Sequence, residues 1–412
     1  MVEARNTVQD EHVGLGAAQG RIGFLGIQCD TANLGLSALA YSAVAVLDAL
    51  VPPDVEFVLF SANSQESLRE LTTTLGITRP LEAVPFWLRR PGALMHTVGE
   101  INRCDLVVDF TGGDSFSDIY GSKRLFRKLI HKELVLATRT PLVLAPQTYG
   151  PLKHRAWARW YRHVVDRAAL VVARDDLSRR FLESLTEREV LVSTDVAVLL
   201  PWTADPPVAG RVAFNVSGLL WGGGYTGTNQ FALKTDYRAF CHGVVEGLLA
   251  EGHEVHLVPH VITRPWEGGV EDDVAASQEL VREHPGCTLA PAFTSPVAAK
   301  SHIATAEAFI GSRMHATIGA FTAGVPTIPV AYSRKFAGFF GNLGYSTLVD
   351  LGSASTEEAI EQTLALVEDR QRLAELAQPA RGMAQQSIDV FREALRRTLP
   401  VELNAPHDGL RG

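Results

Sequence analysis

Cationic side chains follow two apolar runs in the last quarter of the sequence, and they are the residues best suited to hold an anion. Arg313 and His315 come directly after the run 306–310 and begin an apolar helical segment. The run 327–331 is followed by more polar residues, namely Tyr332, Arg334 and Lys335. Several cationic donors beside a helix N-terminus, whose dipole favours negative charge, suit a small multivalent anion. We therefore expect an anion site here.

A further arginine, Arg174, directly follows the apolar run 170–173. An arginine at the carboxyl end of a parallel strand points toward the region where ligands bind in open α/β sheets. We expect Arg174 to reach the same anion. The alternative is a salt bridge with neighbouring aspartates.

An acidic, glycine-containing loop follows the run 106–110. Gly112 and Gly113 permit close approach of the backbone, and Asp114 and Asp118 come directly after them. Carboxylates accept hydrogen bonds from hydroxyl groups and can serve as general bases, so this loop predicts a site for a sugar hydroxyl. The alternative is a turn in which Asp118 caps a helix.

Asn33 and Gly35 lie between the apolar run 21–27 and a segment of helical spacing, 36–50. Asn33 can bond a ligand, and Gly35 permits close backbone approach. The alternative is a simple turn in which Asn33 caps the helix.

These candidate residues depend on a chain in which strands alternate with helices. Such alternation predicts parallel sheets covered on both faces, with ligands at the carboxyl ends of the strands. The predicted strands are 21–27, 55–60, 106–110, 141–145, 170–173, 190–193, 211–216, 254–258, 306–310 and 327–331. Helical spacing covers 36–50, 237–251, 273–283 and 356–398.

The chain is long enough for two domains, because 412 residues exceed the size at which one hydrophobic core normally stops growing. The segment 201–210 is rich in proline and small residues and lies near the midpoint. We expect an α/β fold of two Rossmann-like domains facing a cleft. The amino-terminal domain would span 21–200, the carboxyl-terminal domain 211–400, and the linker 201–210.

Composition excludes several classes of protein. The formal net charge of −8 argues against nucleic-acid binding, so any anion site must be local. The four cysteines are isolated, so we expect no metal, and we expect no cofactor. Residues 1–20 lack the apolar run of a secretory signal, and no stretch is apolar enough to span a membrane. We therefore expect a cytoplasmic protein.

Together these segments resemble the polysaccharide pyruvyl transferase family over about residues 21–350. The most specific match is Gly311-Ser-Arg-Met-His-Ala316, followed by Gly324-Val-Pro326 and by Tyr332 to Lys335. Further matches are Thr111 to Asp114 with Asp118, Pro146 to Pro151, Ala173 to Asp175, Thr194-Asp195, Phe214 to Ser217, and Val258-Pro-His260 followed by Asp272-Asp273. Members of this family transfer the enolpyruvyl group of phosphoenolpyruvate to sugars as a pyruvate ketal, on a glycosyltransferase-B-like scaffold.

The resemblance implies a role for each candidate residue. Arg174, Arg313, His315 and Lys335 would hold phosphoenolpyruvate. Because imidazole titrates near working pH, His315 would also be either the acid or the donor to the leaving phosphate. Asp114 or Asp118 would be the base, and Asn33, Gly112 and Gly113 would contact the acceptor. That acceptor would be a sugar linked to a nucleotide or a lipid, with at most peripheral membrane contact, and the enzyme could form a homo-oligomer. The chain departs from the family pattern at Leu36 and Asp114, where the family has Asp and Gly.

Two other functions fit the same scaffold. A glycosyltransferase that uses a nucleotide sugar would need an acidic residue for the ribose in the second half, and the sequence has no clear motif of that kind. A catalytically silent sugar-binding protein would not need Arg313, His315 and Lys335.

Overall fold

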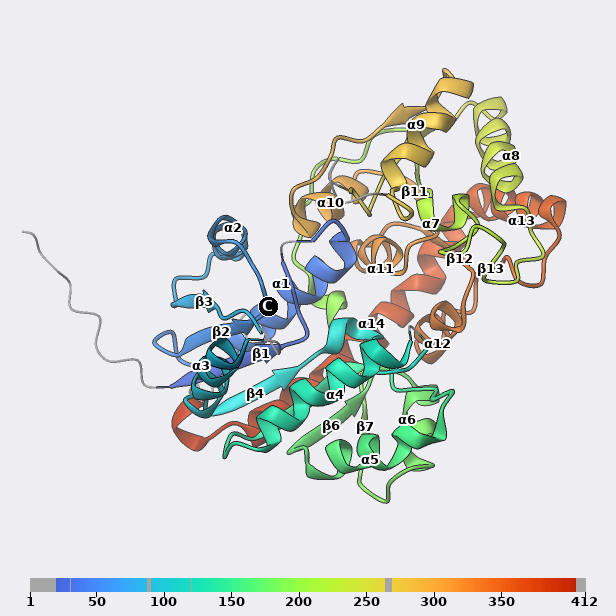
Figure 1. The fold of residues 1–412 in the computed structure, drawn as a ribbon. Coiled ribbons are helices and arrows are strands. Elements are labelled where there is room, and N and C mark those ends of the chain that lie inside the picture. Colours follow the sequence, from blue (N-terminus) through green and yellow to red (C-terminus); the bar gives the residue numbers. More distant parts are fainter. Residues whose placement is uncertain (1–19, 30, 87–89, 120, 264–268, 405–412) are drawn as a thin grey trace, which may run out of the picture.

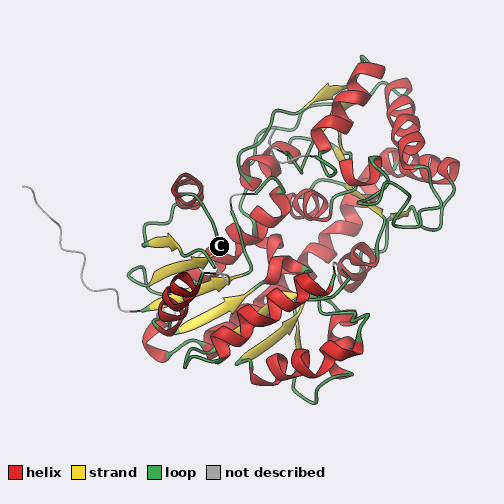
Figure 2. Cartoon of the chain, viewed as in Figure 1, coloured by secondary structure: helices red, strands yellow, loops and turns green. Residues whose placement is uncertain are grey.

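The computed structural model describes residues 20–404, except for residues 30, 87–89, 120 and 264–268. The absence of a secretory signal, predicted for residues 1–20, concerns a segment that lies almost wholly outside the described residues. Two parallel sheets, each covered by helices, form the two halves of the described chain (Figures 1 and 2).

The first sheet has seven parallel strands among the described residues, in the order β3-β2-β1-β4-β5-β6-β7. Its strands are β1 (Arg21–Leu25), β2 (Glu56–Phe60), β3 (Leu81–Ala83), β4 (Leu106–Asp109), β5 (Leu142–Gln147), β6 (Leu170–Ala173) and β7 (Leu191–Val192). The helices between them are α1 (Leu34–Asp48), α2 (Gln65–Leu75), α3 (Pro91–Asn102), α4 (Ser122–Leu136), α5 (Ala158–Arg167) and α6 (Asp176–Glu183). Short 3-10 helices lie at η1 (Thr111–Gly113), η2 (Arg155–Trp157) and η3 (Val196–Leu199).

The second sheet has six parallel strands in the described part of the chain, in the order β10-β9-β8-β11-β12-β13. Its strands are β8 (Arg211–Asn215), β9 (Glu254–Leu257), β10 (Thr288–Leu289), β11 (Ala308–Gly311), β12 (Thr327–Ala331) and β13 (Val349–Asp350). The helices of this half are α7 (Gly218–Trp221), α8 (Tyr237–Ala250), α9 (Asp273–Glu283), α10 (Pro296–Ile303), α11 (Met314–Ala323), α12 (Arg334–Asn342) and α13 (Thr356–Glu368). The chain continues through α14 (Arg370–Thr398) to η4 (Val401–Leu403).

The predicted α/β class with two Rossmann-like sheets is confirmed, because every predicted strand forms and all strand pairs are parallel. Three strands have no counterpart in the sequence-based prediction, namely β3, β10 and β13. Each has only two or three residues at or near a sheet edge, too few for a periodic pattern. The predicted helix 356–398 is divided at Asp369, where α13 ends and α14 begins.

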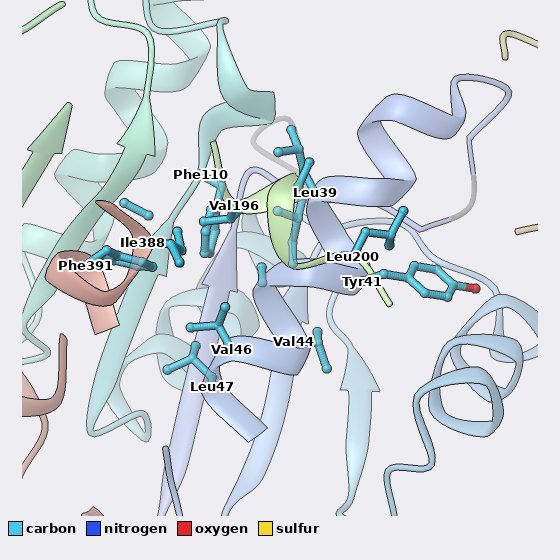
Figure 3. Packing of buried hydrophobic residues seen from close by; sticks show 14 of the residues in the cluster. Leu39, Tyr41, Val44, Val46, Leu47, Phe110, Val196, Leu200, Ile388 and Phe391 are labelled. Carbon is cyan, nitrogen blue, oxygen red and sulfur yellow. The ribbon is translucent and has the colours of Figure 1, made fainter. Parts of the chain in front are cut away.

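The last helix, α14, packs against the first sheet although it follows the second in sequence. Ile388 and Phe391 of α14 are fully buried in the same cluster as Val46 of α1, Phe110 and Val196. Figure 3 shows these side chains close together, and Figure 1 shows α14 extending from the second half along the first sheet. An amphipathic pattern predicts that a helix buries one face but not which sheet covers it. The domain boundaries at 201–210 and 400 remain a prediction.

We expect Phe391→Ala to destabilise the protein strongly, because it removes a buried aromatic ring that joins α14 to the first sheet. The free energy of unfolding should fall by about 3–5 kcal/mol, measured by urea denaturation. The matched control is Val390→Ala on the exposed side of the same helix, which should change stability by no more than about 0.5 kcal/mol. Equal effects of the two substitutions would contradict this packing.

Candidate functional site

The site lies where the carboxyl ends of the two sheets meet. Arg174 follows β6, and His315 lies in the first turn of α11 after β11. The two halves are joined here by backbone contacts: the Leu34 amide donates to the His260 carbonyl at 3.1 Å, and Asn33 forms an isolated antiparallel bridge with Val261. Strand ends and helix N-termini of both halves therefore surround one small region.

A carboxylate between the two halves holds one cation from each. Asp195 is fully buried, and its Oδ2 accepts a hydrogen bond from Arg174 Nη1 at 2.8 Å. The Nε2 atom of His315 lies 3.7 Å from the same oxygen, an ion-pair distance. Burial by itself would raise the pKa of Asp195, but His315, Arg174 and the backbone amide of Ala197 lower that pKa to about 2. Asp195 is thus an anion at neutral pH and can stabilise an imidazolium at His315.

Two glycines let backbone segments of the first half approach this cluster. A Cβ on Gly35 would lie 2.5 Å from His315 Nδ1, closer than any real side chain tolerates. A Cβ on Gly113 would lie 3.4 Å from Arg174 Nη1, and the φ of Gly113 is 77°, in the left-handed region. The contact with His315 therefore requires a glycine at position 35, whereas the positive φ favours a glycine at position 113. The predicted contact of Gly113 with an acceptor remains a prediction.

A buried ion pair between Lys132 and Asp109 stabilises the loop that carries Gly112 and Gly113. Thr111, Gly112 and Gly113 all have positive φ, at 44°, 61° and 77°. Lys132, fully buried in α4, lies 3.0 Å from Asp109 Oδ2 and donates to Thr111 Oγ1 at 2.6 Å. A positive φ costs free energy at a residue other than glycine, and the hydrogen bond from Lys132 holds Thr111 in this conformation.

Lys335 and Asp114 pair with each other across the two halves. The Lys335 ammonium in the first turn of α12 contacts Asp114 Oδ2 in the loop after β4. Both side chains keep about a fifth of their surface exposed, 22% and 23%. The pair is therefore accessible, and an anion of higher charge can compete with Asp114 for the ammonium.

Arg313 is anchored by two acidic residues of its own half. Its Nε and Nη2 donate to Asp273 Oδ1 at 3.1 and 2.8 Å, and its Nη1 donates to Glu271 Oε2 at 3.1 Å. Burial opposes the charge, but Asp273 and Glu271 raise the pKa of Arg313 above its ordinary value. Asp273 also accepts the backbone amides of Gly218, His260 and Val261. Asp273 therefore fixes the segments after β8 and β9, and Arg313 neutralises its charge.

Asp118 and Asn33 also make contacts that shape the backbone. Both carboxylate oxygens of Asp118, which is only 3% exposed, accept backbone amides, from Lys153 at 2.6 Å and His154 at 2.9 Å. Asn33 caps α1 by accepting the Gly35 amide at 3.0 Å. The structure thus brings Arg174, His315, Asp114 and Lys335 to the contacts between the halves, whereas it engages Asp118 within the first half.

Two helix N-termini at the site have no capping side chain. The helices α7, α8, α9, α10 and α13 each begin after a Ser or Asp whose side chain accepts a backbone amide. Within the described residues, α11 and α12 begin without such a bond. They follow the adjacent strands β11 and β12, so their free first-turn amides face the same sheet edge. This pair of N-termini suits an anion.

Arg174 lines one pocket, which has a volume of about 340 Å³. Its lining combines residues of α6, β7, α12 and α14 with the loop after β7, among them Thr194, Asn342, Met383 and Gln386. A second hollow, of about 380 Å³, lies in the second half between Trp221, Phe231 and Arg238, and contains none of the predicted site residues. Only the first of these hollows bears on the candidate site.

Sequence reasoning assigned no role to Asp195 and His260. Both follow predicted strands, β7 and β9, so the rule that ligands bind at strand carboxyl ends could have selected them. Asp195 also caps η3 by accepting the Ala197 amide at 3.0 Å. Because helix capping is a common role for aspartate, the sequence gives no sign of its second contact, with Arg174.

The fold places the protein among two-domain, glycosyltransferase-B-like proteins. UDP-GlcNAc 2-epimerase from Neisseria meningitidis, solved with UDP-GlcNAc, has a TM-score of 0.53 at 12% identity, over 92% of this chain and 100% of that one. HepE from Anabaena, solved with UDP-glucose, has a TM-score of 0.53 at 14% identity, over 92% and 99%. MnaA from S. aureus, solved with UDP, has a TM-score of 0.55 at 12% identity, over 94% and 99%. At these identities the similarity shows the fold alone.

The family follows from the sequence. The profile of the polysaccharide pyruvyl transferase family matches residues 33–334, and the chain belongs to this family. It is therefore a transferase of the pyruvyl type. No curated protein matches the chain. In the part of the chain that the structure describes, no helix is both long and apolar enough to cross a bilayer.

We expect Arg313→Ala to lower stability as well as activity, because it leaves the fully buried Asp273 without its cation. Breaking a buried ion pair should reduce the free energy of unfolding by about 3–5 kcal/mol, measured in urea. Arg282→Ala, at an exposed position of α9, is the control and should stay within about 0.5 kcal/mol of the wild type. A wild-type unfolding curve for Arg313→Ala would show that these contacts do not anchor the site.

Proposed function

We propose that this transferase takes phosphoenolpyruvate as its donor and forms a pyruvate ketal on a pair of sugar hydroxyls, with release of phosphate. The observation that carries the proposal is the convergence of Arg174, His315 and Lys335 on one region beside the uncapped N-termini of α11 and α12. An anion with both a phosphate and a carboxylate needs this number of donors.

Lys335 is proposed to change partners when the donor binds. Its contact with Asp114 is partly exposed, so the phosphate can displace the carboxylate and take the ammonium. Asp114 is then released beside the site and can accept the proton of a sugar hydroxyl. Of the two predicted bases, Asp114 is favoured over Asp118, because both oxygens of Asp118 already accept backbone amides.

His315 is proposed to be the acid. Asp195 would stabilise its imidazolium, which gives a proton to the methylene carbon of phosphoenolpyruvate. The hydroxyl then attacks the cationic C2, the bond from C2 to the phosphate oxygen breaks, and a second hydroxyl closes the ketal. Of the two hydroxyl protons, one balances the proton placed on carbon and the other leaves with phosphate.

The remaining predicted residues are proposed to act through position. Arg313 would contribute its positive field and fix the loop of His260, and its predicted direct contact with the donor remains a prediction. Gly112 and Gly113 would give a sugar access to the backbone beside Arg174, and Asn33 would orient α1. The solved proteins of similar fold are bound to UDP or UDP-sugars, which supports testing nucleotide-linked sugars first.

Phosphate release tests the proposal. The enzyme is incubated with phosphoenolpyruvate and a panel of nucleotide- and lipid-linked sugars, and inorganic phosphate is measured. Phosphate should appear only with phosphoenolpyruvate and an accepted sugar. Release of the nucleotide from a nucleotide sugar, without phosphoenolpyruvate, would instead indicate a glycosyltransferase.

We expect His315→Ala to lose turnover, by about 100-fold or more, because general acid catalysis typically contributes that much. The protein should still fold, as checked by its melting temperature, because Asp195 keeps its hydrogen bonds from Arg174 and from the Ala197 amide. His253→Ala, distant in sequence and paired with Glu251, is the control and should retain activity. Wild-type phosphate release by His315→Ala would remove His315 from the reaction.

We expect Lys335→Ala and Asp114→Asn to change the Michaelis constant for phosphoenolpyruvate in opposite directions. Loss of the ammonium removes a charge-assisted contact worth about 1.5–3 kcal/mol and should raise the constant more than tenfold. Asp114→Asn removes the competitor for Lys335, so the constant should fall while kcat drops through loss of the base. Equal constants in all three proteins would place the pair outside the donor site.

A further inference from the structure

One imidazole at the site has no hydrogen-bond partner in the described part of the chain. His260 follows β9 and is only 4% exposed, yet neither of its ring nitrogens has a hydrogen-bond partner among the described residues. A buried polar group without a partner costs free energy, and native structures keep very few of them. The described residues supply no partner, which points to a partner from outside them.

Hydrogen bonds fix the backbone of His260 on both sides of its ring, so the position of the ring is well defined. Its amide donates to Asp273 Oδ2 at 3.1 Å, and its carbonyl accepts the amide of Leu34 at 3.1 Å. The next residue of α1, Gly35, lies against the ring of His315. Both histidines therefore adjoin the first turn of α1, where the two halves meet.

The surroundings of His260 favour an anion. Burial, and to a lesser extent the neighbouring positive charges of His315 and Arg313, lower the pKa of its imidazole to about 3. The ring is therefore neutral and offers one N–H donor and one acceptor nitrogen. The neighbouring positive charges of His315 and Arg313 favour an anionic ligand at this ring.

We infer that His260 is a direct ligand of the donor substrate, and that its ring N–H donates to an anionic oxygen of phosphoenolpyruvate. The inference rests on the proposed function and adds to it a residue for which sequence reasoning gave no role. On this inference His260 lowers the stability of the free protein, because its ring N–H gains a hydrogen-bond partner only when the donor binds.

The chain contains a matched control four residues earlier, in β9. His256, in β9, is 6% exposed and equally a buried histidine, but both of its nitrogens have partners: Thr288 Oγ1 at 2.6 Å and His302 Nε2 at 2.8 Å. Replacing His256 removes satisfied hydrogen bonds, whereas replacing His260 removes unsatisfied polar atoms. Replacing His256 should therefore lower stability and leave binding unchanged, whereas replacing His260 should weaken binding and leave stability unchanged or higher.

The test compares His260→Leu, His260→Gln and His256→Leu with the wild type, by calorimetric melting and by titration with phosphoenolpyruvate. His260→Leu should melt at the wild-type temperature or above and bind phosphoenolpyruvate at least about tenfold more weakly. His260→Gln, which keeps a donor, should bind with intermediate affinity. His256→Leu should melt lower and bind with the wild-type dissociation constant.

Two results would overturn the inference while leaving the proposed function in place. One is an unchanged dissociation constant in His260→Leu. The other is a large fall in melting temperature for both variants of His260, which would make the residue structural. If the wild type itself has no affinity for phosphoenolpyruvate, the proposed function fails, and the inference fails with it.

Discussion

The candidate site depends on one buried carboxylate that is shared by the two halves of the molecule. Asp195 binds Arg174, which follows a strand of the first sheet, and faces His315, which begins a helix of the second. A buried charge is tolerated only when it is well paired, so Asp195 requires that both cations stay near it. This requirement fixes the relative position of the two sheet edges where the ligands would bind.

Pairing between carboxylates and cations also keeps several cations together in a protein whose net charge is negative. In this structure each predicted donor ligand already has a carboxylate partner: Arg174 and His315 have Asp195, Arg313 has Asp273, and Lys335 has Asp114. These pairs differ in exposure. Arg313 and Asp273 are buried and serve as an anchor, whereas Lys335 and Asp114 are accessible to solvent and can exchange partners. Exposure thus distinguishes the Lys335–Asp114 pair, which can exchange partners, from the Arg313–Asp273 pair, which cannot do so without leaving a buried charge unpaired.

Much of the fold could be predicted from sequence, because its longer strands are buried apolar runs and its loops follow strand ends. The placement of α14 could not, since its apolar face would fit either sheet. At the site, residue types predicted which loops converge. They did not predict that Asp118 would bind the amides of Lys153 and His154, because those partners lie 35 and 36 residues away. No role was predicted for His260, because what sets it apart is that its ring has no hydrogen-bond partner among the described residues, which residue types alone do not reveal.

The central claim is that the enolpyruvyl carbon of phosphoenolpyruvate becomes part of the sugar product. The most direct measurement uses phosphoenolpyruvate labelled with carbon-13 at C2, incubated with the enzyme and an accepted sugar, and follows the label by NMR. The account predicts that the label appears as a ketal carbon bonded to two sugar oxygens, with equimolar release of phosphate. Recovery of the label only as pyruvate or as unchanged phosphoenolpyruvate, while the sugar is modified in another way, would contradict it.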